Sequence, residues 1–174
     1  MMGRFLMQAL ALAVMEMRAR RHECLTMEHL LLAMTREQLG RVILQGCGAD
    51  IPALRHQLDE YPTRYLPAMD AEQGSESEVL QTPALERILE RAVAHVHGSG
   101  RKEMDIGDVL ASMFEEPDCW AAYYLRKQGV DRLRVLEFVS HELPEILRQA
   151  TRRRASSEQE EEESSQELSL KLIQ

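Results

Sequence analysis

Histidine is the residue of this chain best suited to bind a metal ion, and two groups of histidines lie close in sequence. One group is His22 and His29 with the carboxylates Glu23 and Glu28, and the other is His95 with His97. Imidazole and carboxylate groups can together ligate zinc, but neither group has the spacing of HExxH or of a Cys/His finger. His29 fits better as a local partner in a helix cap, so we expect no metal and no cofactor.

The three cysteines, Cys24, Cys47 and Cys119, are widely spaced, and no CxxC motif occurs. This pattern argues against a disulfide framework or a zinc site and favours the reducing cytoplasm. A catalytic thiol would need a positioned base and a pocket, which no motif provides for Cys24 or Cys119. We expect both to be small buried apolar residues. An enzyme that uses histidine or cysteine chemistry is therefore the weakest of the functions considered.

The net charge of −8 argues against two classes of partner. An acidic chain has no long-range attraction for nucleic acid or for an anionic membrane, so neither is expected as a partner. No stretch reaches the roughly 18 apolar residues of a membrane span. The basic run at 18–21 is flanked by Glu16 and Glu23 and is interpreted as the solvated end of a helix.

Few aromatic residues and many Leu, Ala, Met, Glu and Arg residues favour helices over sheets. Trp120, Tyr123 and Tyr124 could form a patch that grips a substrate. Their spacing on one short helix instead favours core packing for Trp120 and partial exposure of one tyrosine.

An internal duplication organises the elements that position these side chains. Five apolar residues recur 79 positions later: Leu6, Leu10, Ala13, Val14 and Met17 correspond to Leu85, Leu89, Ala92, Val93 and Val96. The same offset relates Leu30, Leu31 and Met34 to Val109, Leu110 and Met113. After a shift of two residues, Leu44, Gly48, Asp50 and Leu54 match Leu125, Gly129, Asp131 and Val135. The chain is therefore predicted to be all-α, with eight helices in two pseudo-repeated four-helix units.

Each copy has the same boundary residues. The first helix is expected at 4–20 and 82–98, and the third at 38–46 and 118–128. Thr26 and Asp105 are placed to cap the second helix, and each cap is accompanied by a hydrophobic staple. The fourth helix is expected to be capped by Asp50 and by Asp131. Glycines that can adopt the left-handed conformation end the third helix, namely Gly46 or Gly48 in copy one and Gly129 in copy two.

Residues 1–147 are expected to form one domain, with repeat one at about 4–61, a linker at 62–81 and repeat two at about 82–142. The linker is rich in Pro, Gly, Ser and acidic residues and is long for an internal loop, so we expect it to be mobile or functional. The tail at 148–174 has blocks of opposite charge and few apolar residues, which predicts a disordered charged segment.

The opening residues also have features of a secretory signal peptide, with Ala11-x-Ala13 as a cleavage site. Copy two has its own first helix, however, so copy one needs residues 4–20 to complete the same unit. We therefore expect these residues to belong to the fold.

Several stretches of the duplicated body resemble the Clp N-terminal repeat domain of the Clp AAA+ unfoldases, and within that family the ClpA branch. They are residues 21–23, 26–34, 87–96, 99–101, 121–127 and 138–141. The Glu-His-Leu-Leu-Leu-Ala stretch from Glu28 is typical of the superfamily. The stretches Ala-Ala-Tyr-Tyr-Leu-Arg-Lys at 121–127 and Phe-Val-Ser-His at 138–141 are typical of ClpA. The resemblance covers about residues 2–142.

This resemblance implies a non-catalytic docking domain that binds a ClpS-type adaptor and protein substrates. Such a domain delivers them to an assembly of Clp ATPase and peptidase for unfolding and degradation. The chain itself has no G-x-x-x-x-G-K-[S/T] motif, so we expect no ATPase activity from it. An alternative is a free-standing regulator that sequesters the adaptor or substrate without an attached ATPase. The isolated domain is expected to be monomeric, because the family's hexamer contacts lie in its ATPase domains.

The resemblance also places adaptor docking on a charged surface formed by Glu23, Glu28, Thr82, Arg87 and Arg91. Opposite charges on such a surface would steer a partner and fix its register. The structural alternative is that Glu28, in a first helical turn, only offsets the helix dipole. Arg87 and Arg91 would then form a solvated helix face.

Overall fold

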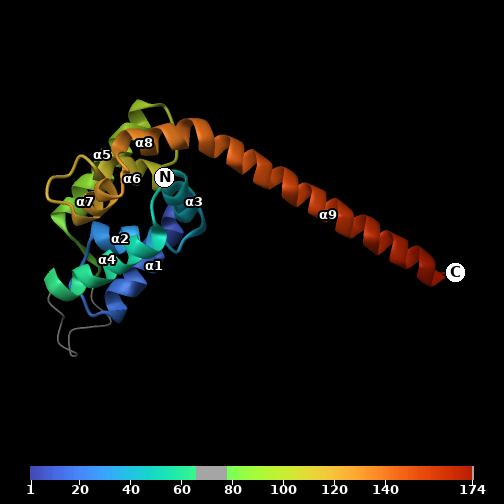
Figure 1. Cartoon of the computed structure of the whole chain (residues 1–174), viewed down its shortest axis with the longest axis horizontal. Coiled ribbons are helices and arrows are strands. Elements are labelled where there is room, and N and C mark those ends of the chain that lie inside the picture. The colour runs from blue at the N-terminus through green and yellow to red at the C-terminus, as the bar shows by residue number, and fades with distance from the viewer. Residues whose placement is uncertain (66–77, 174) are drawn as a thin grey trace. The chain divides into compact units, whose positions relative to one another are not determined.

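Two successive four-helix units make up most of the chain, as the duplication predicts. The computed structural model describes residues 1–65 and 78–173. Copy one contains α1 (Arg4–Ala19), α2 (Met27–Met34), α3 (Gln38–Gly46) and α4 (Ile51–Tyr65). Copy two contains α5 (Pro83–Gly98), α6 (Ile106–Met113), α7 (Trp120–Lys127) and α8 (Arg132–Glu137) (Figure 1). The predicted all-α class with two pseudo-repeated four-helix units is confirmed.

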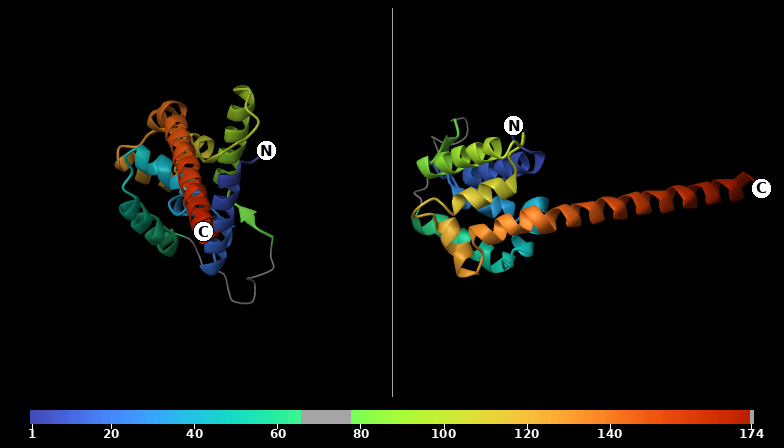
Figure 2. Two further views of the ribbon diagram at one scale, coloured as in Figure 1. Left: turned by 90° about the vertical axis from the view of Figure 1, so that its right-hand side faces the viewer. Right: turned by 90° about the horizontal axis from the view of Figure 1, so that it is seen from above.

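The core is built around the second helix of each copy. Every residue of α2 and every residue of α6 is buried, which is typical of helices enclosed on all sides. α2 packs against α1, α3, α4 and α7, while α6 packs against α3, α5 and α8 (Figure 2). Because α2 contacts α7 and α6 contacts α3, the two copies share one core.

Short strand pairings connect the two copies in a way that preserves the 79-residue offset. β1 (Cys24–Leu25) pairs in parallel with β2 (Leu80–Gln81), so that Leu25 faces Gln81. A second parallel bridge joins Met2 to Met104. Gln81 is 79 positions after Met2, and Met104 is 79 positions after Leu25. The second bridge is therefore the first one with the two copies exchanged.

The hydrogen bonds at these bridges repeat as well. The Gly3 N–H donates to the Met104 carbonyl oxygen at 2.8 Å, and the Thr82 N–H donates to the Leu25 carbonyl oxygen at 3.0 Å. As a result α1 begins beside α6, and α5 begins beside α2.

The first helix of each copy ends in the same left-handed turn. Arg21 has φ 58° and Gly100, its counterpart, has φ 73°. The next N–H closes the turn in each copy, from His22 to the Met17 carbonyl at 3.0 Å and from Arg101 to the Val96 carbonyl at 3.1 Å. The left-handed conformation is disfavoured for an arginine because of its Cβ atom. Copy one therefore carries a local strain that copy two avoids.

A left-handed glycine follows the third helix of each copy, Gly48 with φ 94° and Gly129 with φ 83°. Gly46 is instead the last residue of α3 and does not have a positive φ. A Cβ atom at Gly46 would lie 2.1 Å from Cε2 of Phe138. Close packing against Phe138 therefore explains the glycine at position 46, while the left-handed turn belongs to Gly48.

The predicted caps of the fourth helices are present. Asp50 Oδ1 accepts a hydrogen bond from the Ala53 N–H at 3.1 Å, and Asp131 Oδ1 accepts one from the Arg134 N–H at 2.8 Å. These bonds satisfy N–H groups that have no partner inside the helix.

The chain divides into a compact unit, Met1–Phe138, and a second unit that begins at Val139. A π-helical turn, η2 (Phe138–Glu142), leads into α9 (Leu143–Ile173), a single helix. This differs from the disordered tail expected from residue 148. Residues 144–173 of α9 are all exposed, which explains the low hydrophobicity of the segment. Its many Glu, Gln, Arg and Leu residues are strong helix formers even without a buried face.

The predicted linker at 62–81 is only partly within the described ranges, and residues 66–77 lie outside them. Residues 62–65 continue α4, and Leu80–Gln81 form β2, a strand that the sequence does not predict. Among the residues that the structure describes, no helix is long and apolar enough to cross a membrane.

Candidate docking surface

The β1–β2 edge holds two of the five residues predicted to dock an adaptor. Glu23 is exposed immediately before β1. Thr82 follows β2 and caps α5, because its Oγ1 atom accepts a hydrogen bond from the Leu85 N–H at 3.3 Å. The strand pairing therefore brings Glu23 and Thr82 to the same edge from positions far apart in the chain.

Arg87 and Arg91 lie on α5 and form an ion-pair network with the segment after α6. Arg87 donates to Glu116 Oε1, through Nε at 3.0 Å and through a shorter bond from Nη2. Arg91 contacts Glu115 at 3.1 Å and Glu116 at 3.5 Å, and donates to the Ser112 carbonyl oxygen at 3.1 Å. The hydrogen bond from Arg87 lowers the pKa of Glu116. The Arg87 side chain remains 54% exposed, so it can also meet a partner.

Glu28, another of the five predicted docking residues, is buried. Its residue exposure is only 7%. Its Oε1 atom accepts hydrogen bonds from the backbone N–H groups of Trp120 at 3.1 Å and Ala121 at 3.3 Å. Glu28 thus caps α7, a helix of the other copy, whose own N-cap Cys119 makes no side-chain bond. The predicted docking carboxylate is an internal support of the core.

The duplication explains why α7 needs this cap. In copy one Glu37 is the N-cap of α3 and accepts from the Leu39 N–H at 3.1 Å and the Gly40 N–H at 2.7 Å. Its counterpart 79 positions later is Glu116. Extra residues between Glu116 and α7 separate the Glu116 carboxylate from the start of α7. This carboxylate binds Arg87 of α5 instead. In copy two the N-terminus of α7 is therefore capped by Glu28 and not by Glu116.

His22 and His29 are a hydrogen-bonded pair beside this edge. His29 Nδ1 accepts from the Thr26 N–H at 3.0 Å, which completes a capping box in which Thr26 Oγ1 accepts from the His29 N–H at 3.2 Å. With Nδ1 an acceptor, neutral His29 carries its proton on Nε2. That proton points to His22 Nδ1 at 2.8 Å.

Burial of the two imidazoles favours their neutral forms. Burial, followed by the charge of His22, lowers the pKa of His29 to about 4. Burial also lowers the pKa of His22. Within the described part of the chain, no group of three or more His, Cys, Asp or Glu residues could hold a metal ion. The pair therefore acts as a neutral helix cap, as expected for His29.

An aromatic cluster covers the start of α7. Trp120 is 37% exposed and Tyr123 is 44% exposed, so the expectation of core packing was wrong for Trp120, while partial exposure of a tyrosine is confirmed. Trp120 borders a hollow of about 480 Å³ whose lining also includes Glu116, Asp118 and Tyr123. The buried Glu28 thus caps the N-terminus of α7, while the side chains of Trp120 and Tyr123 lie at the surface.

Two cysteines flank this region, and the thiol of Cys119 is not activated. Cys24 and Cys119 are half-buried, rather than buried as expected. Burial, followed by the charge of Glu28, raises the pKa of Cys119 to about 11. Since the thiolate is the nucleophile, a thiol with this pKa is unreactive at neutral pH.

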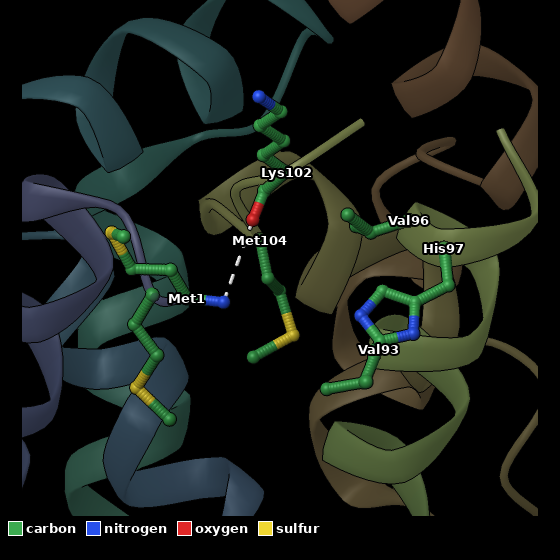
Figure 3. A pocket seen from close by; sticks show the side chains of 7 residues that line it. Met1, Val93, Val96, His97, Lys102 and Met104 are labelled. Atoms are coloured by element: carbon green, nitrogen blue, oxygen red, sulfur yellow. Dashed lines mark hydrogen bonds between the residues drawn. The ribbon is translucent and has the colours of Figure 1, made fainter. Parts of the chain in front are cut away.

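A second hollow lies beside the Met2–Met104 bridge and has a volume of about 240 Å³. Figure 3 shows the side chains around it, with the Met1 amine near the Lys102 carbonyl oxygen. The lining is apolar with a basic margin and consists of Met1, Met2, Val93, Val96, His97, Lys102 and Met104. Flexible methionines adapt to apolar side chains of different shapes, so this methionine hollow is suited to a protruding side chain of another protein. The sequence alone does not predict this hollow, because its lining comes from segments about 100 positions apart.

Comparisons with known proteins agree with this architecture. The family model described as "Clp repeat (R) N-terminal domain" matches residues 2–128. A ClpA homolog protein from Fuscovulum blasticum is 35% identical over 135 residues, which cover 77% of this chain and 17% of that protein. The chain thus spans about a sixth of that relative's length.

Solved structures show the same fold. The Hsp104 N-terminal domain from Candida albicans aligns with a TM-score of 0.66 and 10% identity, over 79% of this chain and 90% of that one. A ClpV N-domain in complex with a VipB peptide aligns with a TM-score of 0.62 and 16% identity, over 80% and 85% of the two chains.

Proposed function

Because the chain belongs to the Clp repeat N-terminal domain family, we propose that it docks a ClpS-type adaptor and protein substrates for a ClpA-like ATP-dependent unfoldase and protease. In this role the domain binds and positions proteins and does no chemistry itself. The observation that carries the proposal is the pairing of β1 with β2, which brings Thr82 and the exposed Glu23 to one edge. Arg87, on the neighbouring helix α5, keeps 54% of its side chain exposed.

The geometry divides four of the five predicted docking residues into two groups, while the fifth, Thr82, caps α5. Glu28 binds the start of α7, and Arg91 binds the segment after α6. Both residues therefore support the docking surface and are not expected to touch the adaptor. Glu23 is exposed, and Arg87 keeps about half of its side chain in water while it binds Glu116. Charges of both signs at the margin of an interface steer encounter and fix register. Glu23 and Arg87 are therefore the residues that we expect to touch an adaptor.

Segments of substrate proteins would use the methionine hollow. The ClpV N-domain in complex with a VipB peptide provides a precedent for a domain of this fold that binds a peptide. Cys24, Cys47 and Cys119 form no disulfide bond, which suits a reducing compartment, and we propose that the protein acts in the cytoplasm.

A binding titration with the ClpS-type adaptor of the same organism tests the proposal. Glu23→Arg reverses an exposed charge. It is expected to weaken binding about tenfold, since the new arginine would repel a basic group of the adaptor that pairs with Glu23. Arg87→Gln is expected to weaken binding less, because Arg91 still pairs with Glu116.

The matched control is Glu103→Arg, the same charge reversal at an exposed residue just before α6. It should bind the adaptor like the wild type. Wild-type affinity in both Glu23→Arg and Arg87→Gln, with folding intact by circular dichroism, would show that the adaptor docks elsewhere.

A further inference from the structure

The outward face of α1 is unusually apolar for a helix at the surface. Met7, Leu12 and Met15 are 58%, 38% and 66% exposed, and Ala11 is exposed between them. Positions 7, 11 and 15 are four residues apart, so they form one stripe along the helix. The opposite face holds the buried residues Leu6, Ala9, Ala13 and Met17.

Arginines stand at both ends of this stripe. Arg4 and Arg18 are exposed on the same face, and the Arg4 guanidinium lies 4.7 Å from the centre of the Phe5 ring. The one carboxylate of α1, Glu16, points off the stripe and contacts Arg20 at 2.7 Å and Arg36 at 3.4 Å. The stripe is therefore apolar and cationic, although the whole chain carries a net charge of −8.

The duplicated copy provides an internal comparison. The counterparts of Met7, Ala11 and Met15 on α5, found 79 positions later, are Glu86, Glu90 and Ala94. All three are exposed, so α5 presents an ordinary solvated acidic face. Both helices pack their other face into the same core. The apolar stripe is thus a feature of α1 that core packing does not require.

We propose that the face formed by Arg4, Met7, Ala11, Met15 and Arg18 docks an acidic amphipathic helix of a partner protein. The inference rests on the proposed docking function and adds a surface separate from the β1–β2 edge. Methionine side chains adapt to the apolar face of such a helix, and the terminal arginines pair with its carboxylates. From Arg4 to Arg18 the face is about 21 Å long, which matches a helix of roughly four turns.

The test uses two synthetic helical peptides of about 16 residues, a length that covers this face. Both carry leucines along one side, and their ends carry either glutamates or lysines. Fluorescence anisotropy should show the glutamate peptide binding about tenfold more tightly than the lysine peptide, with weaker binding in high salt. Equal affinity for the two peptides would overturn the charge argument.

Variants at exposed positions locate the site. The double substitution Met7→Gln and Met15→Gln should weaken binding of the glutamate peptide about tenfold, as expected when apolar contacts are lost. Leu133→Gln, at a residue of α8 that is 63% exposed, is the control and should bind normally. Wild-type affinity in the double variant would place the peptide on another surface.

Two further measurements separate this inference from its alternatives. Sedimentation should show that the wild type is a monomer. A wild-type dimer that becomes a monomer in the double variant would mean that a second copy of the chain occupies the face. Adaptor binding should be unchanged in the double variant, while Glu23→Arg should still bind the glutamate peptide. If the glutamate peptide does not bind preferentially while the adaptor still binds, the α1 site is rejected and the adaptor proposal stands.

Discussion

Acidification should destabilise the domain through the His22–His29 pair. His29 Nδ1 accepts a hydrogen bond from the Thr26 N–H. A proton on Nδ1 would point at that N–H group, so the hydrogen bond would be lost. The folded state therefore excludes the proton, and the pKa of His29 is lowered from 6.5 to about 4. A group with a lowered pKa stabilises the fold fully above pH 6.5 and loses that contribution as the pH falls towards 4.

The size of the effect follows from the pKa difference. Each unit of pKa corresponds to about 1.4 kcal/mol, so complete protonation of His29 would remove about 3 kcal/mol from the free energy of unfolding. From about pH 7 to about pH 5 the loss is about 2 kcal/mol. His22, whose pKa is also lowered by burial, acts in the same direction. A loss of this size is a large share of the stability of a typical domain.

Urea unfolding followed by far-UV circular dichroism across this pH range measures the loss. His29→Gln provides the comparison, because glutamine at this position of a capping box accepts the N-cap N–H and does not titrate. The variant should lose about 2 kcal/mol less than the wild type on going to about pH 5. His95→Gln, at an exposed residue of α5, should follow the wild type. Parallel pH curves for wild type and His29→Gln would refute the proposed protonation pattern.

Three other substitutions test a helix cap and two left-handed turns of the fold. Glu28→Ala should lower the free energy of unfolding by about 2 kcal/mol, because the N–H groups of Trp120 and Ala121 lose a charged acceptor; an unchanged urea midpoint would show that Glu28 does not support α7. Arg21→Gly should raise the free energy of unfolding by about 1 kcal/mol, because it relieves a left-handed arginine. Gly100→Ala, at the equivalent turn of copy two, should lower the free energy of unfolding by a similar amount. Midpoints of thermal unfolding that shift in the same direction in both variants would contradict this comparison.

Most of the fold was predictable because its determinants are local or repeated. Thr26 and Asp105 cap helices within their own segment, and Asp50 and Asp131 do the same for the fourth helices. A hydrogen bond to an N–H three residues ahead depends only on neighbours in sequence, so residue type and spacing are sufficient to predict it. The tail differed because low hydrophobicity predicts the lack of a buried face, whereas helix propensity favours α9.

The candidate docking surface was less predictable, and Glu28 shows why. The family resemblance placed it on a charged docking surface, yet it is buried and caps a helix that begins 92 residues later. Whether a carboxylate meets solvent or another helix depends on how distant segments pack. The exposure of Trp120, which is 37%, likewise depends on how α7 packs against the rest of the fold.

The amino-acid sequence by itself determined the helices, their caps and the duplication, because these depend on residues a few positions apart and on a fixed offset. Only the tertiary structure decided that α1 begins beside α6, that Glu28 is internal and that the methionine hollow exists. These features require groups about 80 to 100 positions apart to come within a few ångströms. Hydrogen bonds and van der Waals contacts act only over such short distances, and the folding of the two copies around one core brings the groups together.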